Sequence, residues 1–266
     1  MQEMFLGGSE TSSTSIEWAL AELIRNPETM MKAKKEISSV VGSNKKFEES
    51  DIDKLSYLQA VIKETLRLHP PLPFLIPRRA TQDTNFMGYL IPKNTQVFVN
   101  VWAIGRDEQY WEEPLVFKPE RFLGSKIDYK GQHFEFLPFG AGRRICPGLP
   151  LGQRVMHFML GSLLHEFDWE LEFSANPNTI DMTEVIGSVM RKREPLKVAF
   201  LSYKSDERTV RILNVTISFV DILGAKTLKR KGLNSWIKTK AKTYYWPFVL
   251  LIVSEKDLYG SEQFLD

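Results

Sequence analysis

Cysteine is almost absent from this sequence: Cys146 is the only one among 266 residues. A single thiol cannot build a disulfide framework, so we expect a reducing compartment. It also cannot supply the four Cys or His ligands that structural zinc usually takes, and the 4 histidines include no pair with ligand spacing. The sequence therefore does not predict a structural zinc site.

Long hydrophobic runs and an excess of one charge are also missing. The longest apolar run, Tyr244–Val253, has 10 residues, whereas a membrane-spanning helix needs about 20. The first residues carry neither the basic region nor the apolar core of a signal peptide. A net charge of +2 is too small to indicate a nucleic-acid or acidic partner. We expect no nucleic-acid binding and no membrane anchor in these residues.

The chain does contain a glycine-rich loop around its one cysteine. This loop, from Phe136 to Gly148, includes Arg143 and Arg144 and comes just before an amphipathic segment. Arginines, backbone N–H groups freed by small residues and the positive end of a following helix all stabilise a thiolate. Because Cys146 has no companion ligands, a metal bound there must bring its own remaining ligands. Haem does so, since it takes one axial thiolate from the protein.

The pattern Phe139-x-x-Gly142-x-Arg144-x-Cys146-x-Gly148 resembles the haem-thiolate signature of the cytochrome P-450 family. Four further stretches match the family in the same order, so the resemblance covers about residues 4 to 202. It implies that haem b is the cofactor and that Cys146 is the metal ligand. Arg144 and Arg78 would hold the haem propionates, because a guanidinium binds a carboxylate with two N–H groups. The other cofactor-binding positions that it implies are Phe139, Gly140, Gly142 and Gly148.

A second notable stretch is Gly7-Gly8-Ser9-Glu10-Thr11, at the start of a strongly helical segment. Alone, two glycines in this position are more typical of a frayed helix start. The stretch also resembles the family's oxygen-activation motif, which lies in a long helix crossing the distal face of the haem. The resemblance implies that Glu10 and Thr11 are catalytic residues that relay protons to oxygen. Gly7 would leave room beside them.

Glu64 and Arg67 are three residues apart on one face of a predicted helix. Alone, such a pair predicts a surface ion pair of little energy. Here Leu68-His69-Pro70 ends the helix abruptly, and the whole resembles the family's Glu-x-x-Arg motif. The resemblance implies a buried guanidinium–carboxylate set, completed by Arg121, that fixes the segment carrying the cysteine loop. We interpret its role as structural.

Two apolar segments resemble parts of the family's substrate pocket. The first, Leu72–Ile76, is equally well interpreted as an apolar core strand, and the second, Val185–Val189, resembles the family's last substrate-contacting turn. The pocket residues that we predict are Gly7, Leu72, Phe74, Leu75, Ile186 and Val189.

Periodicity predicts the main elements. Helical spacing favours helices over residues 1–25, 27–41, 57–68 and from the cysteine loop to about 165. Asn26 is the expected cap of the second helix, with Pro27 at its first position and Gly42 at its end. The last helix should bury the face formed by Leu151, Val155, Phe158, Met159 and Ser162. Branched residues predict strands over residues 168–173 and 196–201, and a hairpin over residues 89–99 that turns at Lys93-Asn94.

These features predict a mainly α fold with a small β region, resembling the C-terminal half of the cytochrome P-450 fold. On this interpretation residues 1–204 are the C-terminal portion of a catalytic domain, and the rest of that domain is incomplete here. Residues 205–266 form a tail outside the family, unstructured or read through from intronic or untranslated sequence. The alternative for this tail is a basic patch at a membrane surface, beside the Tyr244–Val253 run.

The resemblance is strongest to plant members of the geraniol hydroxylase type. It implies a monooxygenase that inserts one atom of O2 into a C–H bond of a small apolar metabolite, terpenoid-like or alkaloid-like. Electrons would come from NADPH through NADPH–cytochrome P-450 reductase. The location implied is the cytosolic face of the endoplasmic reticulum membrane, with membrane association only in a full-length form. The alternative is a catalytically inactive fragment that at most binds haem.

Overall fold

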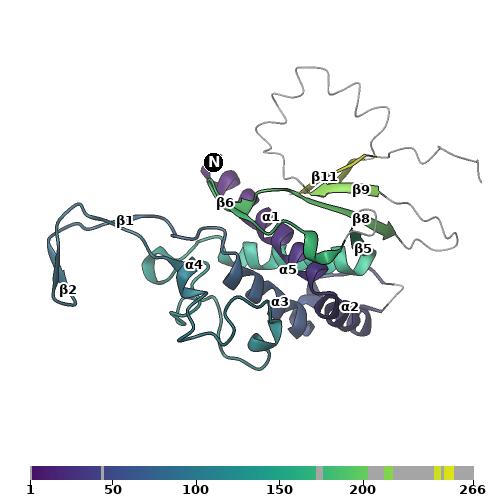
Figure 1. Ribbon diagram of the computed structural model, residues 1–266, viewed down its shortest axis with the longest axis horizontal. Helices are drawn as coiled ribbons and strands as arrows, with labels where there is room; N and C mark the ends of the chain where they lie inside the picture. The colour runs from purple at the N-terminus through teal and green to yellow at the C-terminus, as the bar shows by residue number, and fades with distance from the viewer. Residues whose placement is uncertain are drawn as a thin grey trace, which may run out of the picture.

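The structure is a computed structural model that describes residues 2–42, 45–171, 176–202, 213–217, 243–246 and 249–254. Its centre is a group of packed helices, with small sheets on one side and a long hairpin that extends away from them (Figure 1). The predicted fold class, mainly helical with a small β region, is confirmed.

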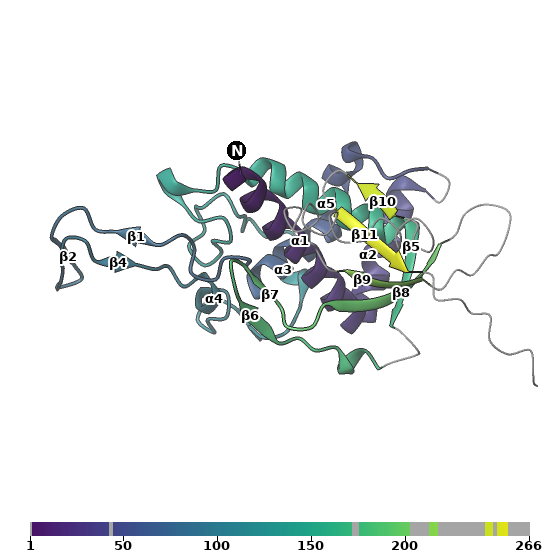
Figure 2. The same ribbon diagram turned by 90° about the horizontal axis from the view of Figure 1, so that it is seen from above.

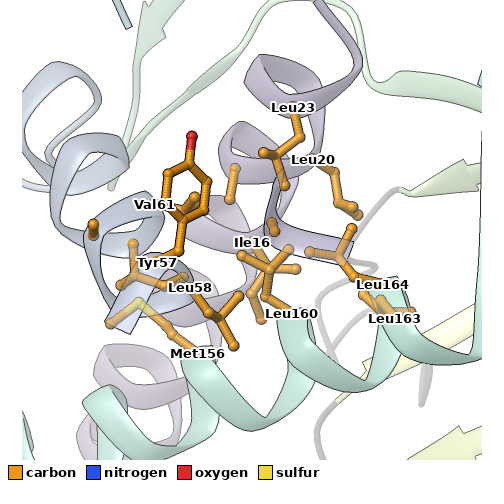
Figure 3. Packing of buried hydrophobic residues seen from close by; sticks show 14 of the residues in the cluster. Ile16, Leu20, Leu23, Tyr57, Leu58, Val61, Met156, Leu160, Leu163 and Leu164 are labelled. Carbon is orange, nitrogen blue, oxygen red and sulfur yellow. The ribbon is translucent and has the colours of Figure 1, made fainter. Parts of the chain in front are cut away.

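The helical core is built from α1 (Gln2–Arg25), α2 (Pro27–Val41), α3 (Ser56–Leu68) and α5 (Leu149–Glu166). These helices confirm the segments that periodicity predicted. Each contributes an apolar stripe because its aliphatic side chains recur every three or four residues. Figure 3 shows where three of the stripes meet, with side chains from α1 (Ile16, Leu20), α3 (Leu58, Val61) and α5 (Leu160, Leu164).

The junction between α1 and α2 differs in one detail from the prediction. Asn26 stands at the cap position, but its side chain accepts no hydrogen bond from the helix that follows. Its amide group instead donates back to the carbonyl oxygen of Glu22 on α1 at 2.8 Å. Pro27 at the start of α2 and Gly42 at its end, with φ 80°, lie as predicted.

The buried face of α5 was only partly predicted. The predicted member Leu151 is 62% exposed, whereas the apolar residues that are buried are Met156, Met159, Leu160, Leu163 and Leu164. The reason is that α5 packs against α1, α2 and α3 at once, so its buried surface is wider than a single stripe. Its first turn follows the cysteine loop and lies outside this packing.

The extended hairpin contains β1 (Arg78–Arg79), β2 (Thr84–Phe86), β3 (Tyr89–Ile91) and β4 (Gln96–Val97). It projects away from the helices in both views (Figures 1 and 2). β3 pairs with β2, and β4 pairs with β1. The predicted hairpin over residues 89–99 is therefore wrong, although Asn94 does lie in a left-handed turn with φ 70°. Met87 and Gly88, at φ 51° and 83°, form a tighter two-residue turn that pairs β3 with the preceding strand instead.

The other helices of the described chain are short. They are η1 (Glu49–Lys54), α4 (Val101–Ile104), η2 (Pro119–Phe122), η3 (Gly142–Arg144) and η5 (Pro177–Thr179). The long segment between α4 and α5 is mostly irregular and carries the cysteine loop at its end.

Two further sheets lie beyond α5. β6 (Glu184–Ile186) pairs with β7 (Met190–Lys192). A five-stranded sheet has the order β10-β11-β9-β8-β5, with bounds β5 (Phe167–Leu171), β8 (Leu196–Ser202), β9 (Leu213–Ile217), β10 (Thr243–Trp246) and β11 (Val249–Ser254). β5 and β8 confirm the two predicted strands, except that residues 172 and 173 lie outside the described residues. Of the predicted tail, β9, β10 and β11 are described, and its other residues lie outside the described ranges.

Across the residues described, no helix combines the length and apolar character needed to cross a membrane.

Candidate functional site

The cysteine loop is held by its own backbone. The Cys146 N–H donates to the carbonyl oxygen of Phe139 at 2.9 Å, and the Leu149 N–H donates to the carbonyl oxygen of Cys146 at 3.3 Å. Gly140 and Gly142 have φ of 74° and 64°, a left-handed conformation that side chains other than glycine adopt only with strain. The loop therefore presents a free, half-buried thiol three residues before Leu149, the first residue of α5.

Two other segments press against this loop. A Cβ atom added to Gly131 would lie 2.9 Å from the Cα atom of Ala141, so only glycine fits there. A Cβ atom added to Gly140 would lie 3.5 Å from Cδ1 of Leu75. The structure thus places Leu75, a predicted pocket residue, beside the cysteine loop. Gly148 is also close, since its Cβ would lie 3.8 Å from the Cys146 sulfur atom.

The two arginines predicted to bind propionates are close in sequence to the two residues of this contact. Arg78 starts β1, three residues after Leu75, and is half-buried, while the exposed Arg144 ends η3. In the part of the chain that the structure describes, neither guanidinium makes an ion pair or a hydrogen bond. Both are therefore open to a carboxylate ligand.

Glu64, Arg67 and Arg121 form a buried ionic cluster. Glu64 accepts hydrogen bonds from Arg67 Nε and Nη2, both at 2.8 Å, and from Arg121 Nε at 3.0 Å. The Lys118 N–H adds a further bond at 2.7 Å. Glu64 and Arg67 are 0% and 1% exposed, so the surface ion pair that spacing alone favours is not what forms.

The arginines of this cluster also hold the irregular segment that leads to the cysteine loop. Arg67 donates to the carbonyl oxygens of Gly105 and Pro114, and Arg121 donates to that of Glu112 at 2.9 Å. Both guanidinium groups lie over the ring of Trp111. One carboxylate and two guanidinium groups therefore fix several turns of a segment that has little regular structure.

The predicted oxygen-activation stretch lies within α1 and is fully helical. The Thr11 hydroxyl donates to the carbonyl oxygen of Gly7 at 2.7 Å, and the Ser12 hydroxyl donates to that of Gly8 at 2.9 Å. A Cβ atom on Gly7 or Gly8 would meet nothing within 4 Å. The frayed helix start is thus not seen, and packing within the described residues gives no reason for glycine here.

The remaining predicted pocket residues differ in their exposure to solvent. Phe74 is 38% exposed and Ile186 is 63% exposed, whereas Val189 is 5% exposed. Leu72 is half-buried, and the Met190 N–H donates to the carbonyl oxygen of Pro71 at 2.8 Å. That bond places the turn between β6 and β7 beside the Leu72–Ile76 segment.

A buried polar cluster that the sequence did not reveal contacts Glu184, the first residue of β6, at the base of this turn. His69 lies between two carboxylates, with Nδ1 2.7 Å from Glu184 and Nε2 2.9 Å from Glu22. Its ring stacks on Trp18 at 4.0 Å between centroids. Glu184 also accepts from Trp102 Nε1 at 2.7 Å and from Arg106 at 3.1 Å. Burial acts to raise the pKa of Glu184, but these donors outweigh it and leave that pKa below its ordinary value.

The sequence profile of the family described as Cytochrome P450 matches residues 1–200. The chain belongs to the cytochrome P450 family. Solved cytochrome P450 structures from zebra fish agree, one of them determined with progesterone: it has a TM-score of 0.67 at 34% identity, and covers 76% of this chain and 44% of that one.

Curated plant members of the family are closer in sequence. Cytochrome P450 76A1 of Solanum melongena is 66% identical over 196 residues, which cover 74% of this chain and 42% of that protein. The iridoid oxidase of Catharanthus roseus is 58% identical over 198 residues, covering 74% of this chain and 38% of that protein. Geraniol 8-hydroxylase of the same plant is 52% identical over 195 residues, covering 73% and 40%. The chain thus spans less than half the length of these relatives.

The residues of the cysteine loop fit the haem that the cytochrome P450 family implies. Cys146 offers one unpaired thiol, and no group of three or more His, Cys, Asp or Glu among the described residues could hold a bare metal ion. Arg78 and Arg144 supply two cations that form no ion pair with the described residues and could bind carboxylates. One thiol and two guanidinium groups suit haem, because its iron needs a single ligand from the protein and its propionates need cations.

Proposed function

We propose that this chain carries the haem-thiolate part of a cytochrome P450 monooxygenase. The observation that supports this most directly is the setting of Cys146: the sole thiol of the chain, half-buried, at the end of a loop closed by the bond to Phe139. The thiolate of this residue is the form that would bind iron.

The proposed substrate is a small apolar metabolite, terpenoid-like or alkaloid-like. The names of the relatives, iridoid oxidase and geraniol 8-hydroxylase, support the terpenoid class. The exposed Phe74 and Ile186 and the half-buried Leu75 support an apolar site, because large hydrophobic side chains that solvent can reach are typical of a ligand surface.

In the proposed reaction one oxygen atom of O2 enters a C–H bond and the other leaves as water, which consumes two electrons and two protons. Bound haem supplies the activation of O2, and electron density from a thiolate ligand favours O–O cleavage. The chain's own contribution is to hold that thiolate at Cys146 and to supply protons. The half-buried Glu10 carboxyl exchanges protons with solvent, and the Thr11 hydroxyl, which both donates and accepts, carries them onward.

The electrons come from NADPH through NADPH–cytochrome P450 reductase, and we place the full-length protein at the cytosolic face of the endoplasmic reticulum membrane. We assign residues 1–204 to the catalytic portion and residues 205–266 to a tail outside it. The extent of the family match, which ends at residue 200, supports this division.

A carbon monoxide difference spectrum tests the proposal. The 266-residue chain, expressed with haem and reduced, should give the red-shifted Soret band of a thiolate-ligated iron. Cys146→Ser should abolish this band while leaving the far-ultraviolet circular dichroism unchanged. A band that persists in the serine variant would refute Cys146 as the ligand. No band in the parent chain would mean either that this chain binds no haem or that a thiolate is not its ligand, and the proposal would fail for this chain. A normal band without product formation in the presence of reductase and geraniol would instead identify the chain as an inactive haem-binding fragment.

A further inference from the structure

The turn between β6 and β7 makes a polar contact with the proposed catalytic acid. The Ser188 hydroxyl lies 2.8 Å and 2.9 Å from the two carboxylate oxygens of Glu10, across 178 positions of sequence. Serine is the only donor in this pair, because an ionised carboxylate only accepts. Glu10 lies on α1 and Ser188 at the tip of the turn, so the contact joins two elements that the sequence does not relate.

This turn is held firmly on both sides of Ser188. The Gly187 N–H donates to the carbonyl oxygen of Val189 at 3.1 Å, and the Met190 N–H donates to that of Pro71 at 2.8 Å. At its base, Glu184 is fixed by His69, Trp102 and Arg106. The Ser188 hydroxyl is thus carried on a preorganised support.

We propose that Ser188 is a positioning residue for Glu10. This inference rests on the proposed function, in which Glu10 supplies protons. A glutamate on a helix surface has several rotamers, and a donor that contacts both oxygens selects one of them. In the sequence, Ser188 lies between Ile186 and Val189, which are predicted pocket residues. The turn that contacts the substrate would therefore also orient the Glu10 carboxylate.

The contact itself is tested without turnover, by a double-mutant cycle in the thermal unfolding of the 266-residue chain. The variants are Ser188→Ala, Glu10→Gln and the pair, with Ser39→Ala as matched control, since the Ser39 hydroxyl bonds only within α2. A hydrogen bond to a charged group predicts a non-additivity of roughly 2 °C in Tm. Ser188→Thr, which keeps the hydroxyl, should restore the coupling. Additive effects in the Ser188 pair would overturn the proposal.

Turnover with reductase separates positioning from substrate contact. Ser188→Ala should lower kcat and the product formed per NADPH consumed, on the order of threefold or more, with KM unchanged and with recovery in Ser188→Thr. A change in KM alone would make Ser188 a substrate contact and overturn the proposal. If the parent chain makes no product, the proposed function fails for this chain, and the unfolding cycle alone decides the role of Ser188.

Discussion

Arg121 Nε and Glu64 Oε1 lie 3.0 Å apart although 57 positions separate the two residues. The bond connects a helix of the core to the irregular segment before the cysteine loop. The short helix η2 is the regular element described in that segment, and Arg67 and Arg121 bind several of its carbonyl oxygens. The ionic cluster of Glu64, Arg67 and Arg121 therefore stabilises the segment that leads to the cysteine loop, without contacting Cys146 itself.

Replacing the carboxylate of this cluster should be severely destabilising. Glu64→Gln leaves two buried guanidinium groups without a counter-charge, which costs about 3–5 kcal/mol of unfolding free energy. Chemical denaturation monitored by circular dichroism measures the loss. The control is Glu113→Gln, because Glu113 pairs with Lys118 at 3.4 Å on the exposed surface and such pairs contribute at most about 1 kcal/mol. Equal effects of the two substitutions would contradict the structural role assigned to Glu64.

Glu184 should make the fold sensitive to acid. Its pKa lies below the ordinary 4.5 in the folded chain, so its stabilisation is present above that value and is lost as pH falls through the folded pKa. Glu184→Gln should lower Tm at pH 7, because His69 and Arg106 lose a charged partner. Below about pH 4.5, the Tm of this variant should also fall less with decreasing pH than the Tm of the parent. A variant whose Tm follows the parent in parallel down to pH 3 would refute this account.

Glu17 should have the opposite pH dependence. Burial raises its pKa above 4.5, more than the Leu196 N–H and the charges of Lys192 and Arg191 lower it. The associated stability is complete below 4.5 and is lost as pH rises through the folded pKa. The Tm of Glu17→Gln minus that of the parent should therefore increase between pH 4.5 and pH 7. A difference that stays constant over this range would show that the carboxyl does not titrate abnormally.

Replacing Gly7 of α1 should increase the stability of the fold and lower its activity. No atom of the described residues lies within 4 Å of a Cβ atom added to Gly7, so Gly7→Ala should stabilise the helix by about 0.5–1 kcal/mol. We expect the same variant to lower turnover, since a methyl group would fill space kept for oxygen or substrate. Gly161→Ala on α5 is the contrast: its Cβ would meet the Phe47 ring at 2.4 Å, which predicts a loss of about 1–3 kcal/mol. Unchanged turnover in a stabilised Gly7→Ala would remove Gly7 from the site.

Sequence reasoning succeeded where the signal was local. The helices followed from apolar spacing. For Glu64 and Arg67, spacing alone favoured a surface ion pair, and the buried cluster followed only from the family resemblance. The pairing of β3 was missed because two left-handed turns, at Met87-Gly88 and at Asn94, compete for it, and no local pattern decides between them.

Two of the unpredicted contacts are long-range. His69 meets Glu184 across 115 positions and Glu10 meets Ser188 across 178. A single serine in an apolar turn and a histidine before two prolines carry no spacing that would relate them to acids elsewhere. Only the packing of the turn between β6 and β7 against α1 and Pro71 brings these groups together.

Deletion of residues 205–266 tests where the catalytic portion ends. β8 pairs with β5 from Phe167↔Ser202 to Leu171↔Val198, on the edge opposite β9, so this pairing should survive the removal of β9. A chain ending at residue 204 should therefore keep the Tm of the parent within about 2–4 °C, which corresponds to roughly 1 kcal/mol in a domain of this size, and should keep its carbon monoxide spectrum. The matched control ends at residue 195, which also removes Leu196 and Val198, 3% and 1% exposed in the core, and should unfold. If the cut at 204 were as damaging as the cut at 195, the pairing of β8 with β9 would belong to the catalytic fold and the proposed boundary would be wrong.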